Sequence, residues 1–448
     1  MAEIMYNDHK SPPFAKPAEG WTNLPQNPYA VRWSKFADGE RMPFLVRIST
    51  GLPLLAPTYW IVSCRRPSGK QPNTLCNDLR ALMYVHLWAD ARGVDLQNRL
   101  ESGAFLTLTE VADLDTFCGK YMRDALAELL EAVGCVKLKP RKSKKQRRTV
   151  KLLEKRNRLA AIYSYIEYTS ADYLSRLHLQ PERWKHYNSV RANCLEWISS
   201  RVRAIKKPRR NDLGDREGLE EGDIIRLRAV IEPDHPENPF RPEVRFRNYV
   251  MVKLMLDLGI RRGELLGIRI EDCTLGGSRG TITIHRRPDD PDDPRTNQPA
   301  SKTNARVLPL GGRLTELLHE WIVHHRPKIR GARKHPFLIV SSSDGKPLSL
   351  SMVNKMMRQL RSRVPGLPSE LSAHVLRHTW NDDFSDAMDK KGVPGDQEAK
   401  WRARLMGWRR KESAEAYLRR TVRRRSNQVL VEMHDKLDIQ HATGMPNR

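Results

Sequence analysis

Apolar residues along most of the chain recur at intervals of three and four, which is the period of a helix with one buried face. The clearest early example runs from Asn73 to Gly93. Residues 157–174 repeat the pattern, and the tyrosines among them are expected in the core. Residues 1–72 are instead rich in proline and aromatic residues, and Tyr59–Ser63 is predicted to be a short strand that a proline stops.

The pattern changes after residues 204–218, a basic stretch broken by proline and glycine that is typical of a linker between domains. Helical periodicity returns over 219–231 and 246–259, and helices are expected to dominate from Ser351 to the end. Three candidate strands lie in between, at 280–285, 305–310 and 336–342. The prediction is a mainly α fold with a small antiparallel β-sheet, an α+β arrangement.

The chain has 448 residues, which is too long for one hydrophobic core, so two or three domains are expected. The changes of pattern predict an N-terminal extension of unknown role, a helical domain, a linker, a mixed domain and a C-terminal segment. Their bounds are 1–72, 73–205, 206–218, 219–425 and 426–448. The C-terminal segment carries an apolar stripe over Ser426–Leu437.

The net charge is +26 and the sequence pI is about 10.0, which indicates a polyanionic partner. Nucleic acid is favoured over an anionic membrane, because the sequence has no long apolar run, lipidation signal or basic amphipathic helix. The densest basic runs lie in 137–156 and in the linker. The candidate phosphate contacts, which could alternatively be solvated loop residues, are Arg141, Lys142, Lys144, Lys145, Arg147, Arg148, Lys206, Lys207, Arg209 and Arg210.

The six cysteines are scattered, with no Cys-x-x-Cys pair among them. This spacing indicates neither a disulfide framework nor a zinc site, and no acidic cluster argues for a metal. Free thiols and the lack of an apolar signal core at the N-terminus predict an intracellular, cytoplasmic protein that needs no metal or cofactor.

Two segments of the mixed domain carry candidate phosphate chemistry. Arg261 lies in "LGIRRGEL", where a helix would end at Gly259, and its planar guanidinium suits a phosphate. Glu264, three residues later, is expected to support that arginine. Lys302, in "SKTNARVLPL", is expected between two strands, where an ammonium can protonate a departing oxygen. Taken alone, the arginine fits an exposed basic turn equally well, and most loop lysines are solvated.

The C-terminal part adds a second set of candidates. His374 and Arg377 in "HVLRHT" lie three apart, so on a helix both can reach one phosphate. His378 follows Arg377 directly and is predicted to point away from His374 as a structural residue. Trp408 can donate its indole N–H, and Tyr417, nine residues later, can supply a nucleophilic hydroxyl. Each of these residues alone is more often a packing or surface residue.

The order of these motifs carries more weight than any one of them. The chain contains Arg-x-x-Glu, Lys-Thr followed by Arg306 and Pro309, His-x-Leu-Arg-His-Thr, and Leu-x-Gly-Trp with a tyrosine nine residues on. In this order the set resembles the tyrosine recombinase (phage integrase) family. The resemblance covers about 219–425, and the helical region before it is similar only in position and helicity. Most members carry histidine where this chain has Trp408.

The resemblance implies a C-shaped clamp on double-stranded DNA, formed by a helical core-binding domain and the catalytic domain. Tyr417 would form a 3′-phosphotyrosyl bond without metal or ATP, with Arg261 and Arg377 on the phosphate oxygens. His374 and Trp408 would add hydrogen bonds, and Lys302 would be the general acid. The implied assembly is a homotetramer in the synapse and a monomer or dimer off DNA, with possible accessory recombination proteins. In such a tetramer the C-terminal segment, with its stripe Ser426–Leu437, would dock on a neighbouring copy of the chain.

Two other functions remain open at this point. A topoisomerase-like enzyme would nick and reseal a single duplex by the same tyrosine chemistry. A non-catalytic, architectural DNA-binding protein would keep the fold without cleavage, although the complete set of candidate residues argues against it.

Overall fold

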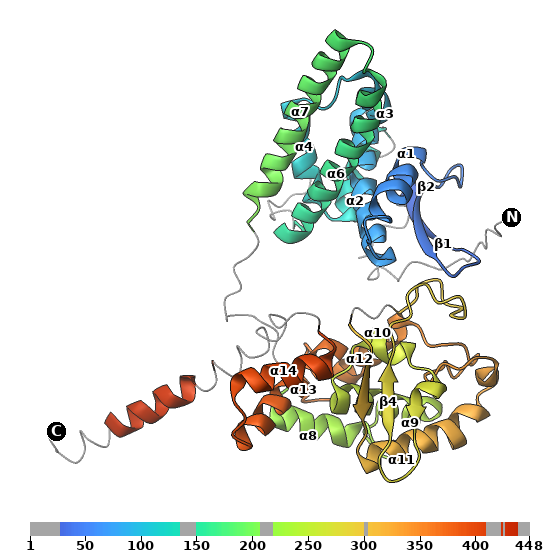
Figure 1. The fold of residues 1–448 in the computed structure, drawn as a ribbon, viewed down its shortest axis with the longest axis vertical. Coiled ribbons are helices and arrows are strands. Elements are labelled where there is room, and N and C mark those ends of the chain that lie inside the picture. The colour runs from blue at the N-terminus through green and yellow to red at the C-terminus, as the bar shows by residue number, and fades with distance from the viewer. Residues whose placement is uncertain are drawn as a thin grey trace. The chain divides into compact units, whose positions relative to one another are not determined.

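The computed structural model describes residues 27–134, 149–206, 218–299, 303–408, 423 and 426–437. The chain divides into two compact units, 1–209 and 210–448. Figure 1 shows that helices dominate both units and that each contains a small sheet. The predicted fold class, mainly α with small antiparallel β-sheets, is confirmed.

The first unit opens with a β-hairpin and continues as a helical bundle. β1 and β2 pair antiparallel, with Tyr29 opposite Arg47. The bundle's longest helices pack against one another, α2 on α6 and α6 on α7. The elements are β1 (Tyr29–Lys35), β2 (Arg41–Arg47), α1 (Leu55–Trp60), the π turn η1 (Ile61–Arg65), α2 (Pro72–Arg92), α3 (Leu96–Ser102), α4 (Leu108–Cys118), α5 (Met122–Ala132), α6 (Leu152–Arg176) and α7 (Pro181–Ala204).

Local sequence signals explain where these helices begin and end. α2 has Pro72 in its first turn, where the missing N–H costs nothing, and it ends at Gly93 with a left-handed φ of 63°. α4 begins with a capping box, in which Thr107 accepts from the Glu110 N–H and the Glu110 carboxylate accepts from the Thr107 N–H. The predicted helix at 73–93 is confirmed.

The hairpin and the bundle share one core. Tyr29, Leu45 and Trp60 are buried in the same cluster as Leu79 and Tyr165. The segment predicted as an extension is therefore part of the first unit from residue 29 onward. The predicted boundary at residue 72 does not lie between two separate cores. The predicted strand Tyr59–Ser63 is wrong, because these residues continue α1 into η1. Trp60 and Ile61 are buried while Tyr59 and Val62 are exposed, because a short helix covers the bundle with one face.

The second unit surrounds a three-stranded antiparallel sheet of order β3-β4-β5 with helices. Both α13 and α11 pack on α9. Its elements are α8 (Glu221–Val230), α9 (Pro242–Leu258), α10 (Arg262–Gly267), η2 (Ile270–Asp272), β3 (Cys273–Thr274), β4 (Thr281–Ile284), β5 (Arg306–Pro309), α11 (Gly312–Glu320), η3 (Trp321–His325), η4 (Arg326–Lys328), η5 (Ala332–Lys334), α12 (Leu350–Arg363), α13 (Ala373–Lys390) and α14 (Gly395–Met406).

Two of the three predicted strands are confirmed, as β4 and β5. The third, at 336–342, is wrong: it makes only isolated bridges, from Phe337 to Arg269 and from Val340 to Pro347. Its run of four apolar residues is buried on all sides within the core, so it resembles a strand in composition without pairing along its length.

The first described residues of the second unit are hydrogen-bonded to α13. The Gly218 N–H donates to Asp382 Oδ2 (3.1 Å) and the Leu219 N–H donates to Thr379 Oγ1 (2.8 Å). A Cβ at Gly218 would lie 2.6 Å from the Thr379 Cα, so only glycine fits this close approach. The described part of the chain that follows the linker is therefore anchored to the middle of α13.

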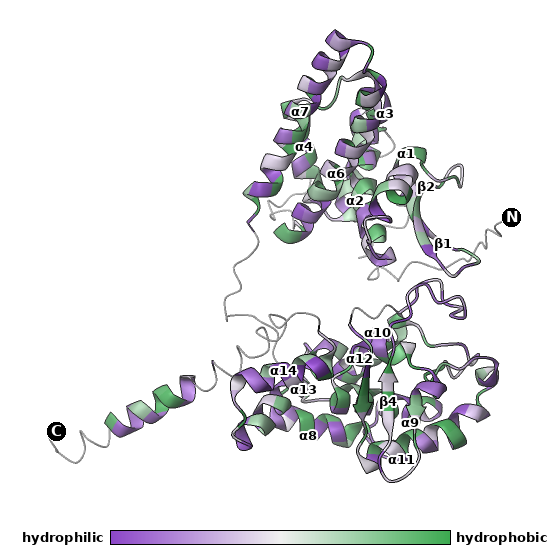
Figure 2. Cartoon of the chain, viewed as in Figure 1, coloured by the Kyte–Doolittle hydropathy of each residue, from purple (hydrophilic) through white to green (hydrophobic). Residues whose placement is uncertain are grey.

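Residues 426–437 form a further helix whose described side chains are all exposed. Both polar and apolar residues lie along it, as Figure 2 shows. Val429, Leu430, Val431, Met433 and Leu437 are each about half exposed. Within the described residues no helix has the length and apolar character needed to cross a membrane.

Candidate active site

Arg261 stands at a tightly fixed turn between two helices. α9 ends at Gly259, which has a left-handed φ of 59°, and Arg261 caps the start of α10. A Cβ at Gly259 would lie 2.8 Å from ring atoms of Trp380, so glycine is required here for both its backbone and its size. The Arg261 side chain is 35% exposed, which leaves it accessible to a ligand.

Glu264, in the first turn of α10, is the buried centre of the site. Its Oε2 accepts from the Arg261 backbone N–H (3.0 Å) and from Arg306 Nη2 (2.9 Å). Its Oε1 accepts from Thr303 Oγ1 (2.6 Å) and, more distantly, from Arg261 Nη1 (3.4 Å). The expected support of Arg261 by Glu264 is therefore present in the structure.

The electrostatic state of Glu264 follows from these neighbours. Burial alone would raise the pKa of its carboxyl, but the charge of Arg306, the hydrogen bonds from Arg306 and Thr303, and the charge of Arg377 together lower the pKa to about 2. Glu264 is thus a carboxylate at neutral pH. Arg377 Nη1 lies 3.9 Å from its Oε2, so one buried anion has three arginines around it.

Arg306, on β5, joins this cluster to the end of α14. Its Nε donates to the Leu405 carbonyl (2.6 Å) and its Nη1 to Thr303 Oγ1 (3.1 Å). Beside it, the Asn304 N–H donates to the Gly407 carbonyl (2.9 Å). A Cβ on Gly407 would lie 2.9 Å from Arg306 Nη1, so the strand and the helix end are in close contact.

Arg377 and Trp408 meet on the same side of the site. Arg377, on α13, is 1% exposed, and its Nη1 donates to the Gly259 carbonyl (2.6 Å). Its guanidinium carbon lies 5.7 Å from the centre of the Trp408 ring, within range of a cation–π contact. The residue after α14 and a residue of α13 therefore approach each other, as the motif order predicts.

A buried polar network fixes α13 against α14. Arg402 donates to the Asn381 carbonyl (2.8 Å) and pairs with Glu398, which also accepts from Ser385 Oγ (2.7 Å). The Asn381 amide in turn donates to the Arg377 carbonyl (2.7 Å). All of these side chains are buried, so the network fixes the spacing between the helix that carries Arg377 and the helix that precedes Trp408.

His374 lies exposed in the first turn of α13, one turn before Arg377. The prediction that His378 points away from it is wrong. The two Nε2 atoms are 3.2 Å apart and the rings are nearly perpendicular, with centroids 4.6 Å apart. The reason is helical geometry, since residues four apart share a face just as residues three apart do.

Several predicted site residues lie outside the described residues. They are Lys302, Tyr417, the basic run Arg141, Lys142, Lys144, Lys145, Arg147 and Arg148, and the linker residues Lys207, Arg209 and Arg210. Of the predicted DNA contacts only Lys206 is described, and it is exposed just beyond α7. The structure thus brings together Arg261, Glu264, Arg377 and Trp408 from the predicted set.

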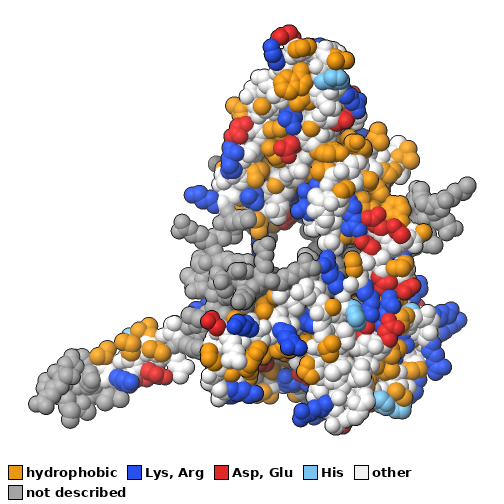
Figure 3. Space-filling model, viewed as in Figure 1, with side chains coloured by type: hydrophobic (Ala, Val, Ile, Leu, Met, Phe, Trp, Pro, Cys, Tyr) orange, Lys and Arg blue, Asp and Glu red, His pale blue; other side chains and the backbone are white. Residues whose placement is uncertain are grey.

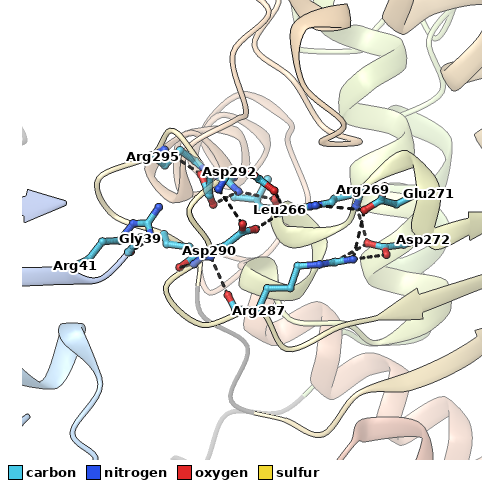
Figure 4. A network of polar contacts seen from close by, with 12 residues as sticks. Gly39, Arg41, Leu266, Arg269, Glu271, Asp272, Arg287, Asp290, Asp292 and Arg295 are labelled. Carbon is cyan, nitrogen blue, oxygen red and sulfur yellow. Dashed lines mark hydrogen bonds and ion pairs between the residues drawn. The ribbon is translucent and has the colours of Figure 1, made fainter. Parts of the chain in front are cut away.

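The loop after β4 is tied to the domain by arginine–aspartate pairs (Figure 4). Arg269 donates to Asp290 Oδ2 (2.6 Å) and Arg287 donates to both oxygens of Asp272 (2.7 and 2.9 Å). Arg295 donates to the Leu266 carbonyl at the end of α10 (3.0 Å). The loop that leads toward Lys302 is therefore fastened to the short helix that follows Arg261.

The sequence marks Thr303 and Arg306 only as parts of a motif and does not mark Asn381 or Arg402. Glu264 lies 39 residues from Thr303 and 42 from Arg306, and Asn381 lies 21 residues from Arg402, so no local pattern reveals these contacts. In the described part of the chain, no group of three or more histidine, cysteine or acidic residues could hold a metal ion. Figure 3 shows basic and acidic side chains interspersed over the face viewed, with apolar side chains gathered on the helix 426–437.

The sequence matches the phage integrase family over residues 236–424. Among curated proteins it is similar to the tyrosine recombinase XerD of Halalkalibacterium halodurans, with 27% identity over 158 residues, or 35% of this chain and 45% of that protein. The XerD of Corynebacterium glutamicum is 23% identical over 152 residues, 34% of this chain and 44% of that protein. The chain thus spans less than half the length of these relatives.

Solved structures include two with partial similarity. The Tn1549 transposon integrase in complex with transposon right end DNA has a TM-score of 0.46 at 13% identity, covering 81% of this chain and 94% of that one. The XerH site-specific recombinase bound to difH has a TM-score of 0.36 at 18% identity, covering 71% and 92%. The family match spans α9, α13 and the turn that carries Arg261, so the C-terminal part of the chain is similar to the phage integrase family over these elements.

Proposed function

We propose that this chain is a site-specific DNA recombinase that breaks and rejoins strands through a tyrosine–DNA bond. The observation that carries the proposal is the convergence on Glu264. Arg261 contacts it at 3.4 Å and Arg377 lies 3.9 Å from it, although these arginines are far apart in sequence. Two guanidinium groups beside one accessible turn are the arrangement that a phosphodiester needs when its non-bridging oxygens gain negative charge.

In the proposed reaction, the Tyr417 hydroxyl attacks the scissile phosphorus. A bond forms between the tyrosine oxygen and phosphorus, the bond to the 5′-oxygen breaks, and the products are a 3′-phosphotyrosine and a 5′-hydroxyl. The tyrosine loses its proton and the 5′-oxygen gains one, so the step is balanced without an external reagent. The 5′-hydroxyl of a second strand then reverses the step and restores a phosphodiester, which explains why no ATP would be needed.

The charged residues have separate tasks in this scheme. Arg261 and Arg377 would hold the non-bridging oxygens, with the Trp408 indole as a further donor. Lys302 would protonate the 5′-oxygen, and His374 would accept the tyrosine proton, assisted by its exposed position. Arg295, in the loop that precedes Lys302 in the sequence, donates to the Leu266 carbonyl at the end of α10.

Double-stranded DNA is the proposed substrate, in keeping with the net charge of +26. A homotetramer would bring two duplexes together, with the exposed apolar residues of helix 426–437 docking on a neighbouring copy. Removal of residues 426–448 should weaken the synaptic complex in native gels while single-site binding is kept. Unchanged synapsis would exclude this role for the helix.

The decisive experiment uses a nicked duplex that carries the DNA end recognised by the protein, in EDTA, with wild type and Tyr417→Phe. The nick lets the short strand downstream of the cleaved bond diffuse away, so the covalent intermediate accumulates. A protein adduct on the 3′ end that Tyr417→Phe cannot form is the expected result. Tight, salt-sensitive binding without any adduct would instead favour an architectural DNA-binding protein.

A second assay separates recombination from relaxation. Supercoiled plasmid that lacks the recognised site should remain supercoiled, whereas a pair of sites should yield recombinant products. Relaxation of any plasmid, without strand exchange, would indicate a topoisomerase-like enzyme.

A further inference from the structure

Arg306 is the buried cation that connects three segments of the site. Its side chain is 5% exposed. Its guanidinium donates to Glu264 from α10, to Thr303 beside Lys302, and to the Leu405 carbonyl near the end of α14. The motifs that contain Arg261, Lys302 and Trp408 are therefore joined through one side chain.

The three arginines around Glu264 lie at different distances from its carboxylate. Arg306 Nη2 lies 2.9 Å from the carboxylate, against 3.4 Å for Arg261 Nη1 and 3.9 Å for Arg377 Nη1. Coulomb attraction falls with distance, and Arg306 is also the more buried partner compared with Arg261. Arg306 therefore balances most of the buried negative charge, and the other two arginines contact it only weakly.

We propose that Arg306 is a positioning residue for DNA cleavage, which neutralises Glu264 so that Arg261 and Arg377 stay directed at the scissile phosphate. The inference rests on the proposed function, because it assigns Arg306 a task in that reaction. Without its cation, the buried carboxylate would draw the two remaining guanidinium groups toward itself. They would then be withdrawn from the phosphate whose charge they must balance.

The charge of the substrate provides the first test. The scissile phosphate is made either as an ordinary phosphodiester or as a methylphosphonate, in which a methyl group replaces one non-bridging oxygen and removes the negative charge. Single-turnover adduct formation is measured for wild type and Arg306→Met. We expect a loss of about 10²-fold on the phosphodiester, the scale of one lost electrostatic contact, and less than about tenfold on the methylphosphonate.

A double variant provides the second test. Glu264→Gln removes the anion that Arg306 balances, so Arg306→Met combined with Glu264→Gln should cleave the phosphodiester at least about tenfold faster than Arg306→Met alone. Equal losses on the two substrates, together with no recovery in the double variant, would overturn the proposal and leave Arg306 a purely structural residue.

Arg326→Met is the matched control for stability. Arg326 is also a buried arginine of the second unit, and it donates to the carbonyls of Phe337, Ala332 and His335, away from Glu264. Its replacement should destabilise the domain without any dependence of the loss on substrate charge. A charge-dependent loss in Arg326→Met would show that the assay reports unfolding and would overturn the assignment to Arg306.

Amide hydrogen exchange on the full chain separates this inference from the proposed function. If wild type forms no adduct on any duplex, the proposed function fails. The exchange rates still test whether Arg306 positions the residues around Glu264. Arg306→Met should speed exchange at Arg261, whose N–H donates to Glu264, and at Asn304, whose N–H donates to Gly407, while Arg326→Met should not. Unchanged exchange at both amides in Arg306→Met would contradict a positioning role.

Discussion

Arg377 donates a 2.6 Å hydrogen bond to the carbonyl of Gly259, across 118 residues of sequence. The bond fastens the start of α13 to the end of α9, two residues before Arg261. This one hydrogen bond thereby fixes the spacing between the two arginines that are proposed to contact a phosphate.

Replacing Arg377 by lysine should test this double task. Lysine keeps a positive charge but lacks the planar fork, so it cannot hold the Gly259 carbonyl and a phosphate together. Single-turnover cleavage should fall by about 10² to 10³-fold. DNA affinity, measured by gel shift at the same salt concentration, should fall far less, since most contacts lie elsewhere on the duplex. An equal loss of affinity and cleavage would contradict the assignment.

Gly259→Ala should destabilise the second unit by about 3 kcal/mol, from left-handed strain and from the clash with Trp380. The measurement is the unfolding midpoint in denaturant. Gly93→Ala is the matched control, because Gly93 is also a left-handed helix end but has nothing within 4 Å of an added Cβ. It should cost only about 1 kcal/mol, and equal losses would show that crowding by Trp380 is unimportant.

Glu264 predicts an acid dependence of stability. Its folded pKa of about 2 lies below the value of about 4.3 for an unfolded glutamate. The stabilisation is therefore fully present above about pH 4 and is lost as the pH falls toward 2. Glu264→Gln should be less stable than wild type at pH 7, yet lose less stability between pH 4 and pH 2. Thermal melts over this range would contradict the prediction if both proteins showed the same acid slope.

The contact between His374 and His378 predicts a graded effect on cleavage. A hydrogen bond between two Nε2 atoms needs one ring to donate and the other to accept, so His378 influences the proton of His374. His374→Ala should slow cleavage by about 10²-fold, as expected for loss of an acid–base group. His378→Ala should slow it by about tenfold, and His378→Asn, which can still donate or accept, should be closer to wild type. Equal rates for His378→Ala and wild type would exclude this influence.

The basic run at 141–148 predicts a salt dependence of DNA binding. Each phosphate contact that is lost should reduce the slope of log affinity against log salt by about 0.9. Changing Arg141, Lys142, Lys144, Lys145, Arg147 and Arg148 to alanine, and measuring binding by fluorescence anisotropy at several salt concentrations, counts these contacts. An unchanged slope would identify the run as a solvated loop.

The sequence was informative where the local pattern and the tertiary structure agree. α2 and α9 follow from apolar periodicity and from glycines at their ends, and β4 and β5 follow from alternation. The order of motifs predicted that Arg261 and Arg377 would converge, which the structure confirms through Glu264.

The remaining features depend on partners that no local pattern reveals. The sequence predicts Arg261 as the partner of Glu264, and no local pattern marks Arg306, 42 residues away, as its nearer partner. The strand predicted at 336–342 failed because a fully buried segment can be apolar without pairing. The prediction that His378 points away from His374 is wrong because residues four apart on a helix share a face, just as His374 and Arg377 do at a spacing of three.

The anchoring of Gly218 and Leu219 on α13 has a mechanical consequence. The linker is the covalent connection between the two units, and its described end is bonded to Asp382 and Thr379, one turn beyond Arg377. Tension along the linker therefore reaches the helix of His374 and Arg377 before any other element of the second unit. If the first unit holds DNA, as proposed, a pull on that unit would act through the linker on the alignment of those two side chains.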